Sequence, residues 1–189
     1  MGKVKGSVII PWVKSIRKDR SGDCDKYLSD EDRKVIFGKV LASAWYPYET
    51  YINCVNTVAK VEANGNLEKI RAWGREWVDK ECEGIYKNTY VKTNPRRAIK
   101  IRQSMFNNFF DSIKIDLEEV SESEYIMSIK VPGPEFKPVF YVALGSMERG
   151  LELNGAEGLK AEFIDKNWEG ASETRIRFSW TGWGQAEEV

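Results

Sequence analysis

Apolar residues recur every three or four positions over most of the first 110 residues, and this is the spacing of amphipathic helices. The clearest run extends from Tyr48 to about Glu62, and Asn64-Gly65 follows it as a stop signal. Its apolar face consists of Tyr48, Tyr51, Ile52, Val55, Val58 and Ala59. The pattern predicts one strong helix over residues 48–62.

Weaker signals mark the other helices. Ser29 precedes three acidic residues and is a typical N-cap. Asn94-Pro95 is a cap followed by a first-turn proline. Helices are predicted over about residues 7–20, 30–41, 66–85, 95–111 and 138–153. Pro11 limits the start of the first. Gly74 falls on an apolar helix face, where its missing side chain would let another helix or a bulky ring approach closely.

The apolar period changes from 3.6 to 2 after residue 112, which is typical of strands with one buried face. Strands are predicted over about residues 113–118, 125–131, 159–163 and 176–180. The fold class is therefore α+β, with N-terminal helices packed on a small, mainly antiparallel four-stranded sheet, and helix 138–153 between the two hairpin-like strand pairs. We expect one domain over residues 1–189, with a helical part over about 7–112 and a sheet-containing part over about 113–181.

Trp45-Tyr46-Pro47 lies between two helical patterns. A proline pushes the residue before it out of the α region, and the proline itself suits the first turn of a helix. We therefore predict a helix-to-helix corner here, with Trp45 and Tyr46 anchoring it against the core.

The amino-acid composition excludes several kinds of functional site. The chain has no histidine, which excludes histidine-ligated haem, histidine-containing zinc sites and the usual nucleophile–histidine pairs. Lys+Arg and Asp+Glu both number 29, so gross charge gives no reason to expect nucleic acid. Three widely spaced cysteines fit a reducing compartment. Because no run of about 18 apolar residues occurs, we expect no membrane span and a cytoplasmic protein.

Aromatic residues gather on the predicted apolar faces. They include Trp45, Tyr48, Tyr51, Trp73, Trp77 and Phe106. These six are the candidate ligand-binding residues of an apolar cavity for a small hydrophobic or aromatic molecule. Alternatively, each ring fills a tightly packed core, since aromatic side chains dominate core energetics in any case. Both interpretations stay open, with the filled core favoured for any single residue.

A basic stretch from residue 87 to 102 contains the second candidate site. Its residues are Lys92, Arg96, Arg97 and Lys100. Cations at the start of a helix are disfavoured by its dipole, and a bound anion or an acidic partner surface would offset that cost. The alternative is a solvated face balanced by the acids of the following hairpin, among them Glu119 and Glu122.

The chain also carries a recognisable series of motifs. They are Ala44-Trp45-Tyr46-Pro47, Trp73-Gly74-Arg75, Gly84-Ile85-Tyr86, Asn94-Pro95, Phe109-Phe110-Asp111, the stretch from Gly145 to Gly155, and Arg177-Phe178-Ser179-Trp180. Over about residues 35–180 this series resembles an uncharacterised bacterial family with a WYP motif. That family is similar, at a distance, to the haem-NO-binding and vinyl-reductase-like (hydrocarbon-binding) superfamily.

The resemblance implies a sensor or small-molecule binder rather than an enzyme. The chain departs from the haem branch, because it has no histidine and lacks that branch's Tyr-x-Ser-x-Arg signature. It also has Asn167-Trp168-Glu169-Gly170 where some relatives carry clustered cysteines. Neither haem nor metal is therefore carried over, and no cofactor is expected. The alternative function is a protein-interaction module that uses the basic stretch, and a homodimer stays open.

Overall fold

The computed structural model describes residues 2–83 and 94–184, which form six helices and eight short strands. The helices are α1 (Gly6–Lys18), α2 (Asp30–Ile36), α3 (Tyr48–Ala63), α4 (Leu67–Cys82), α5 (Pro95–Phe109) and α6 (Lys137–Leu153). The strands are β1 (Lys3–Lys5), β2 (Trp45–Pro47), β3 (Ile115–Ser121), β4 (Glu124–Ile129), β5 (Ala156–Glu157), β6 (Lys160–Asp165), β7 (Thr174–Ser179) and β8 (Gly182–Trp183).

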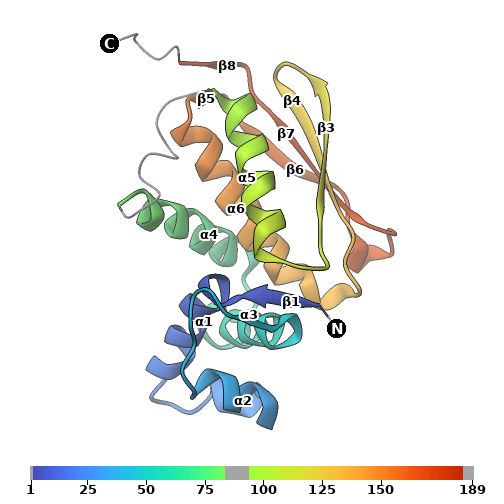
Figure 1. Ribbon diagram of the computed structural model, residues 1–189. Coiled ribbons are helices and arrows are strands. Elements are labelled where there is room, and N and C mark those ends of the chain that lie inside the picture. Colours follow the sequence, from blue (N-terminus) through green and yellow to red (C-terminus); the bar gives the residue numbers. More distant parts are fainter. Residues whose placement is uncertain (1, 84–93, 185–189) are drawn as a thin grey trace.

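The main sheet has the strand order β3-β4-β7-β6, with every neighbouring pair antiparallel. Helices α5 and α6 lie along one face of this sheet, whereas α1, α2 and α3 gather at one end of the molecule (Figure 1). The predicted α+β class is therefore confirmed, as is the placement of a helix between two strand pairs. Tyr125 pairs with Phe178, and Met127 pairs with Ile176. All four are buried on the face toward the helices.

The predicted helix boundaries agree with the capping signals. Ser29 and Asp32 form a capping box at α2, and the side chains of Asn66 and Asn94 cap α4 and α5. Asn64 adopts φ of 49° and ends α3. Helix α1 begins at Gly6, close to the predicted residue 7, and it contains Pro11, which therefore does not limit its start. One predicted boundary was wrong, because α2 ends at Ile36 rather than near residue 41. Residue 85, the predicted end of α4, lies outside the described residues.

Helices α4 and α6 pack closely against each other, and two glycines explain the close packing. A Cβ atom at Gly74 would lie 2.0 Å from the carbonyl oxygen of Val142, and one at Gly145 would lie 1.9 Å from that of Arg71. Each glycine thus lets the facing backbone pack directly against its own. The close approach predicted at Gly74 is confirmed, and the neighbour is a helix.

Ion pairs flank the same helix pair. Arg71 of α4 donates from Nε to Glu148 of α6 over 2.8 Å, and its Nη2 bonds the other carboxylate oxygen. Arg75 donates to Glu152 over 2.6 Å, and Arg149 donates to Asp79 over 2.6 Å. The glycines set the helix separation, and these pairs fix the register of one helix along the other.

The predicted corner at Trp45-Tyr46-Pro47 was wrong. These three residues form β2, which pairs antiparallel with β1. Trp45 is 43% exposed instead of anchoring the core. Tyr46 does pack against the core, as predicted, and its hydroxyl accepts a bond from the Leu41 amide. The prediction used only local signals, whereas the pairing partner is the strand Lys3–Lys5, far back in the chain. Pro47 is tolerated because it ends a short strand and directly precedes α3.

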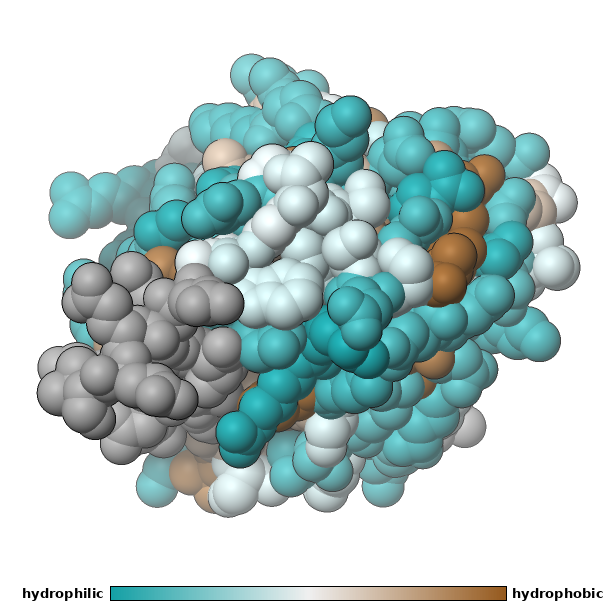
Figure 2. All heavy atoms as spheres, turned by 90° about the horizontal axis from the view of Figure 1, so that it is seen from above, coloured by the Kyte–Doolittle hydropathy of each residue, from teal (hydrophilic) through white to brown (hydrophobic). Residues whose placement is uncertain are grey.

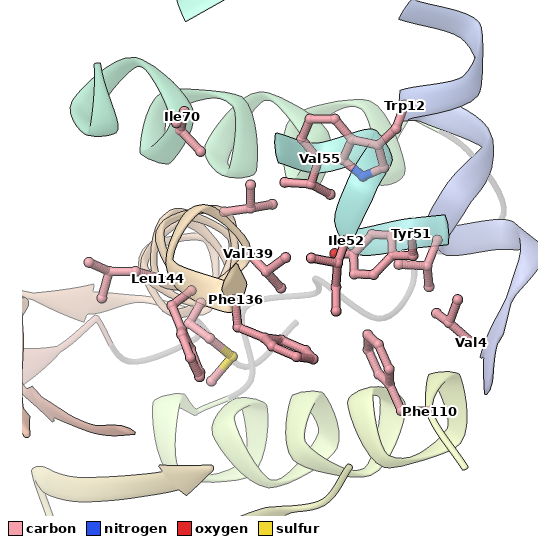
Figure 3. Packing of buried hydrophobic residues seen from close by; sticks show 14 of the residues in the cluster. Val4, Trp12, Tyr51, Ile52, Val55, Ile70, Phe110, Phe136, Val139 and Leu144 are labelled. Carbon is pink, nitrogen blue, oxygen red and sulfur yellow. The ribbon is translucent and has the colours of Figure 1, made fainter. Parts of the chain in front are cut away.

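Buried apolar residues form one cluster that runs from Val4 to Trp180. In Figure 3, Tyr51 and Ile52 of α3 point toward Phe110, Phe136 and Val139, so the N-terminal helices share a core with α5 and α6. Seen from above, the described surface is mostly hydrophilic, and hydrophobic residues appear only as small separate areas (Figure 2). Among the described residues, no helix has the length and apolar character needed to cross a membrane.

Candidate functional site

Three of the six candidate aromatic residues, Tyr51, Trp77 and Phe106, line a cavity of about 80 Å³. The cavity lies between α5, α6 and the sheet, and residues of α1, α3 and α4 complete its wall. Its other apolar lining residues are Val8, Met105, Phe109, Phe110, Ile115, Met127, Val139, Val142, Ala143 and Met147. Aromatic rings and methionine thioethers therefore form most of its wall, with very few polar groups.

Ring contacts hold the wall in place. The rings of Phe106 and Phe110 stack at 4.7 Å between centroids, and Tyr51 meets Phe110 edge-on at 5.8 Å. Tyr51 is only 3% exposed, and burial raises the pKa of its phenol above the ordinary value. Its phenolate form is therefore strongly disfavoured at neutral pH.

Polar groups meet at one end of the cavity. Arg102 of α5 donates from Nη2 to the hydroxyl of Ser146 on α6, and Glu81 of α4 lies in the same lining. Gly150 makes this possible, because a Cβ atom there would lie 2.7 Å from Nη1 of Arg102. The guanidinium thus lies close against α6.

An open groove of about 590 Å³ adjoins the cavity between α1, α3 and α4. Trp12 and Trp73 meet edge-to-face in its wall, with 6.2 Å between ring centroids. Trp12 reaches from α1 toward α4 (Figure 3). Trp77, Glu81 and Val142 line both the groove and the cavity.

The remaining two candidate aromatics lie elsewhere. Tyr48 packs 5.9 Å from the ring of Phe136 and lines a separate shallow pocket beside Gly2. The exposed ring of Trp45 has the ammonium of Lys5 5.4 Å from its centroid. The structure therefore brings together Tyr51, Trp77 and Phe106, places Trp73 next to them in the groove, and leaves Tyr48 and Trp45 outside.

The sequence-based prediction missed the contribution of α6. Ala143, Ser146 and Met147 face the cavity from this helix, as does Val142. A signal was present, since Ala143, Gly145 and Ser146 are small residues on a helix that is otherwise rich in large apolar ones. Arg102 lies at the end of the basic stretch 87–102 and was not among the predicted site residues.

Two of the described cations of the basic stretch, Arg96 and Lys100, have acidic partners within the chain. Arg96 bonds Glu119 and lies 3.4 Å from Glu122, and Lys100 lies 2.9 Å from Glu119. Arg97 is exposed, and Lys92 lies outside the described residues. This arrangement matches the balanced surface that was the alternative interpretation. Use of the stretch by an anion or a protein partner stays a prediction.

The two buried cysteines are not reactive, and residues 2–83 and 94–184 contain no metal cluster. Burial raises the pKa of both Cys24 and Cys54 to about 12, so both are thiols at neutral pH. In the described part of the chain, no group of three or more His, Cys, Asp or Glu side chains could hold a metal ion.

No family model and no curated protein matches the sequence. Solved structures do match the fold. One is the Fe(II) unliganded H-NOX protein from K. algicida, at 13% identity and a TM-score of 0.61 over 94% of this chain and 97% of that one. An H-NOX mutant from S. oneidensis matches at 9% identity and a TM-score of 0.64, over 95% and 97% of the two chains.

The chain has an H-NOX-like fold. A mutant of the T. Tengcongensis H-NOX adds a third match, at 14% identity and a TM-score of 0.60, covering 95% of this chain and 98% of that one. Identities this low establish the fold alone. The expected distant likeness to haem-NO-binding proteins is confirmed, whereas no match supports the WYP-motif family.

Proposed function

We propose that this chain is a small-molecule-binding or sensory domain whose aromatic cavity takes an apolar ligand without haem. The observation that carries the proposal is the cavity itself, with a wall of aromatic rings and methionines drawn from five helices and two strands. Ligand sites are usually apolar hollows with a few polar groups that fix orientation, and here Arg102 and Ser146 supply such groups. The H-NOX-like fold supports the proposal, because it is a fold of small-molecule sensors.

The residues present do not fit haem. Haem iron is held by histidine, cysteinate, methionine paired with histidine, or tyrosinate. The chain has no histidine, and no cysteine is among the described residues that line the cavity. Tyr51 is the tyrosine in the lining, and its raised pKa opposes the phenolate that iron would need. The cavity of about 80 Å³ is also well below the roughly 300 Å³ at which drug-sized ligand sites begin.

The size of the cavity constrains the ligand. An engineered apolar cavity of about 150 Å³ binds benzene or xenon, so about 80 Å³ admits something smaller unless the wall yields. Met105, Met127 and Met147 give the wall that freedom, because methionine is unbranched and has three rotatable bonds. We infer a small apolar ligand, with somewhat larger ones accepted after methionine rotation.

Binding rather than catalysis fits the polar end of the cavity. A serine nucleophile needs a neighbouring base that can take its proton. Ser146 instead accepts a bond from Arg102, and a guanidinium is a donor only. The geometry thus favours a role for this pair in orienting a ligand.

A cavity-filling substitution tests the proposal. Ala143→Leu adds bulk to the lining, and we expect it to abolish binding of small apolar probes such as benzene and 1-butanol while the fold is retained. Ala72→Leu is the matched control, because Ala72 is exposed on α4 and is absent from the lining. Calorimetric titration measures affinity, and circular dichroism checks the fold. Absence of probe binding to the unmodified chain, or undiminished binding to the Ala143→Leu variant, would refute the proposal.

A haem titration tests the proposal that the cavity does not bind haem. We expect added haem to give no saturable shift of its Soret band and no thermal stabilisation of the chain. A stoichiometric, stabilising complex that competes with the apolar probes would show that the cavity accepts haem after all.

A further inference from the structure

Trp77 is part of two walls at once. It lines the cavity together with Tyr51 and Phe106, and it lines the groove together with Trp12 and Trp73. Glu81 of α4 and Val142 of α6 are likewise shared. The cavity and the groove are therefore neighbours, and Trp77 is the aromatic side chain that lies at their boundary together with Glu81 and Val142.

We propose that the groove and the cavity are two chambers of one binding site, divided by Trp77, and that this site takes an elongated apolar molecule. The proposal rests on the proposed function, since it requires that the cavity binds an apolar ligand. One end of the molecule occupies the cavity, and the remainder passes Trp77 and lies along the tryptophans of the groove.

Helices α4 and α6 are packed too tightly to separate, so the indole of Trp77 is the group between the cavity and the groove that can move. Gly74, one turn before Trp77, holds the α4 backbone against the carbonyl oxygen of Val142, and Gly145 repeats this contact from α6. The ion pair between Arg71 and Glu148 spans the same two helices. Separating α4 from α6 would break all of these contacts. Rotation of one half-buried side chain breaks far fewer, so we infer that passage between the chambers occurs by movement of Trp77.

The groove has an apolar wall with charged residues around it. Trp12 and Trp73 form the apolar wall. The charged residues in the described part of the groove are Lys14, Lys18, Lys80, Glu62, Glu76 and Glu81. Because cations and carboxylates are equal in number among them, these residues do not select a charged end of either sign. We therefore expect the site to distinguish ligands by the length of their apolar chain and not by the charge of their polar end. The polar end of the ligand lies in the groove.

A series of ligands of increasing length tests whether one molecule occupies both the cavity and the groove. Straight-chain 1-alcohols from butanol to decanol are titrated calorimetrically into the unmodified chain. We expect affinity to rise about fourfold for each added methylene up to decanol, because each buried methylene adds hydrophobic stabilisation in the groove. Decanoate is expected to bind within about threefold of decanol. A rise that stops at butanol would mean that the ligand ends at Trp77 and would overturn the two-chamber proposal.

Variants then separate the two chambers. Trp73 lines the groove but not the cavity, so Trp73→Ala should weaken decanol at least tenfold and leave butanol unchanged. Ala143→Leu should weaken both. Trp77→Ala should speed association of decanol at least tenfold in stopped-flow fluorescence. Equal effects of Trp73→Ala on butanol and decanol would overturn the proposal.

The outcomes also distinguish this proposal from the proposed function. If butanol binds and Ala143→Leu blocks it, while decanol gains nothing over butanol, the cavity is a ligand site and the two-chamber proposal fails alone. If no alcohol binds the unmodified chain, the proposed function fails first and the two-chamber site with it. The length series uses only the unmodified chain, so it decides the matter even if a tryptophan variant does not fold.

Discussion

Single residues set the tightest distances in this molecule. Gly74 and Gly145 bring two helix backbones together at points where any side chain would overlap a carbonyl oxygen. The overlap involves backbone on both sides, so it cannot be relieved by turning a flexible side chain. The two glycines therefore determine the distance between α4 and α6. They also set the distance between Trp77 on α4 and Val142 on α6, which line the cavity.

Gly74→Ala should destabilise the fold by about 1–3 kcal/mol, the usual cost of overpacking, even though alanine favours helix more than glycine does. Urea unfolding measures the change. Ala72→Ser, at an exposed position of the same helix, serves as the control and should shift the free energy of unfolding by no more than about 0.5 kcal/mol. A Gly74→Ala variant as stable as the control would contradict the close backbone contact.

The cysteines should differ in reactivity. Burial is the main reason that the pKa of Cys24 and Cys54 rises to about 12, which leaves roughly a thousandth of the ordinary thiolate population at pH 8. Cys82 at the end of α4 is only half-buried. Iodoacetamide labelling followed by peptide mass spectrometry should therefore modify Cys82 first in the native chain, and all three together in urea. Early labelling of Cys54 would show that its site is open to solvent.

Charged contacts also join elements that follow one another in the chain. Helix α5 is tied to the hairpin by Glu119 of β3, which lies 2.9 Å from Lys100 and also bonds Arg96. The bond from Lys100, followed by that from Tyr125, lowers the pKa of Glu119 to about 2. The same contacts pair Arg96 and Lys100, two of the four cations predicted to form a partner surface, with a carboxylate of the chain itself.

This contact should make stability depend on pH in the acid range. Because the pKa of Glu119 is lower in the folded chain than in the unfolded chain, the unfolded state binds the proton more readily. The stabilisation is therefore complete above about pH 4.5 and is lost as the pH falls toward about 2. In urea unfolding between pH 6 and pH 3, the stability difference between the unmodified chain and Glu119→Gln should shrink toward acid pH.

Glu162→Gln is the control for this experiment, since Glu162 is paired with Arg177 in an exposed cross-strand contact. Exposed pairs of this kind contribute about 0–1 kcal/mol, so the control should lie close to the unmodified chain at every pH. A constant gap between the Glu119→Gln variant and the unmodified chain across the range would mean that Glu119 keeps an ordinary pKa.

At the scale of elements, local signals predicted most of the fold. The caps at Ser29, Asn66 and Asn94 and the change of period after residue 112 are encoded within a few residues, and the structure confirms them. What failed depended on distant partners. Trp45-Tyr46-Pro47 forms a strand because β1 pairs with it, and the three residues carry no sequence signal that predicts this pairing.

The candidate site shows the same limit. Periodicity placed Tyr51, Trp77 and Phe106 on inward faces, which was sufficient to find three cavity residues. It could not tell that Trp73, one turn before Trp77, would face a groove instead, because that depends on how α1 packs against α4. The role of α6 was missed because a largely buried helix has apolar residues on most sides and no single face stands out.

The whole molecule is organised around one continuous core. Buried residues of α1 and α3 belong to the same cluster as those of α6 and the sheet. The helical part and the sheet-containing part therefore lack separate cores, and each would expose a large apolar surface without the other. The single domain over residues 1–189 stays a prediction, and an unfolding experiment tests it.

Unfolding in urea should accordingly be a single cooperative transition. Tryptophan fluorescence reports on both parts, since Trp12 lies in α1 and Trp180 follows β7, whereas far-UV circular dichroism weights the helices. The two signals should have the same midpoint. Two separated transitions would show that the parts fold independently, and a Trp180→Phe variant would then identify which transition belongs to the sheet.

Strand β1 has a consequence for the order of events during protein synthesis. It pairs with β2, Val4 forms a bridge to Phe110, and the Lys3 amide donates to Asp111 over 2.6 Å. A ribosome adding about 5–20 residues per second needs on the order of 5–20 s to proceed from residue 5 to residue 111. Throughout that interval Lys3–Lys5 has at best β2 as a sheet partner, and the contact with Phe110 and Asp111 closes later. The first of the described strands to be made thus reaches its final surroundings only after about 106 further residues have been added.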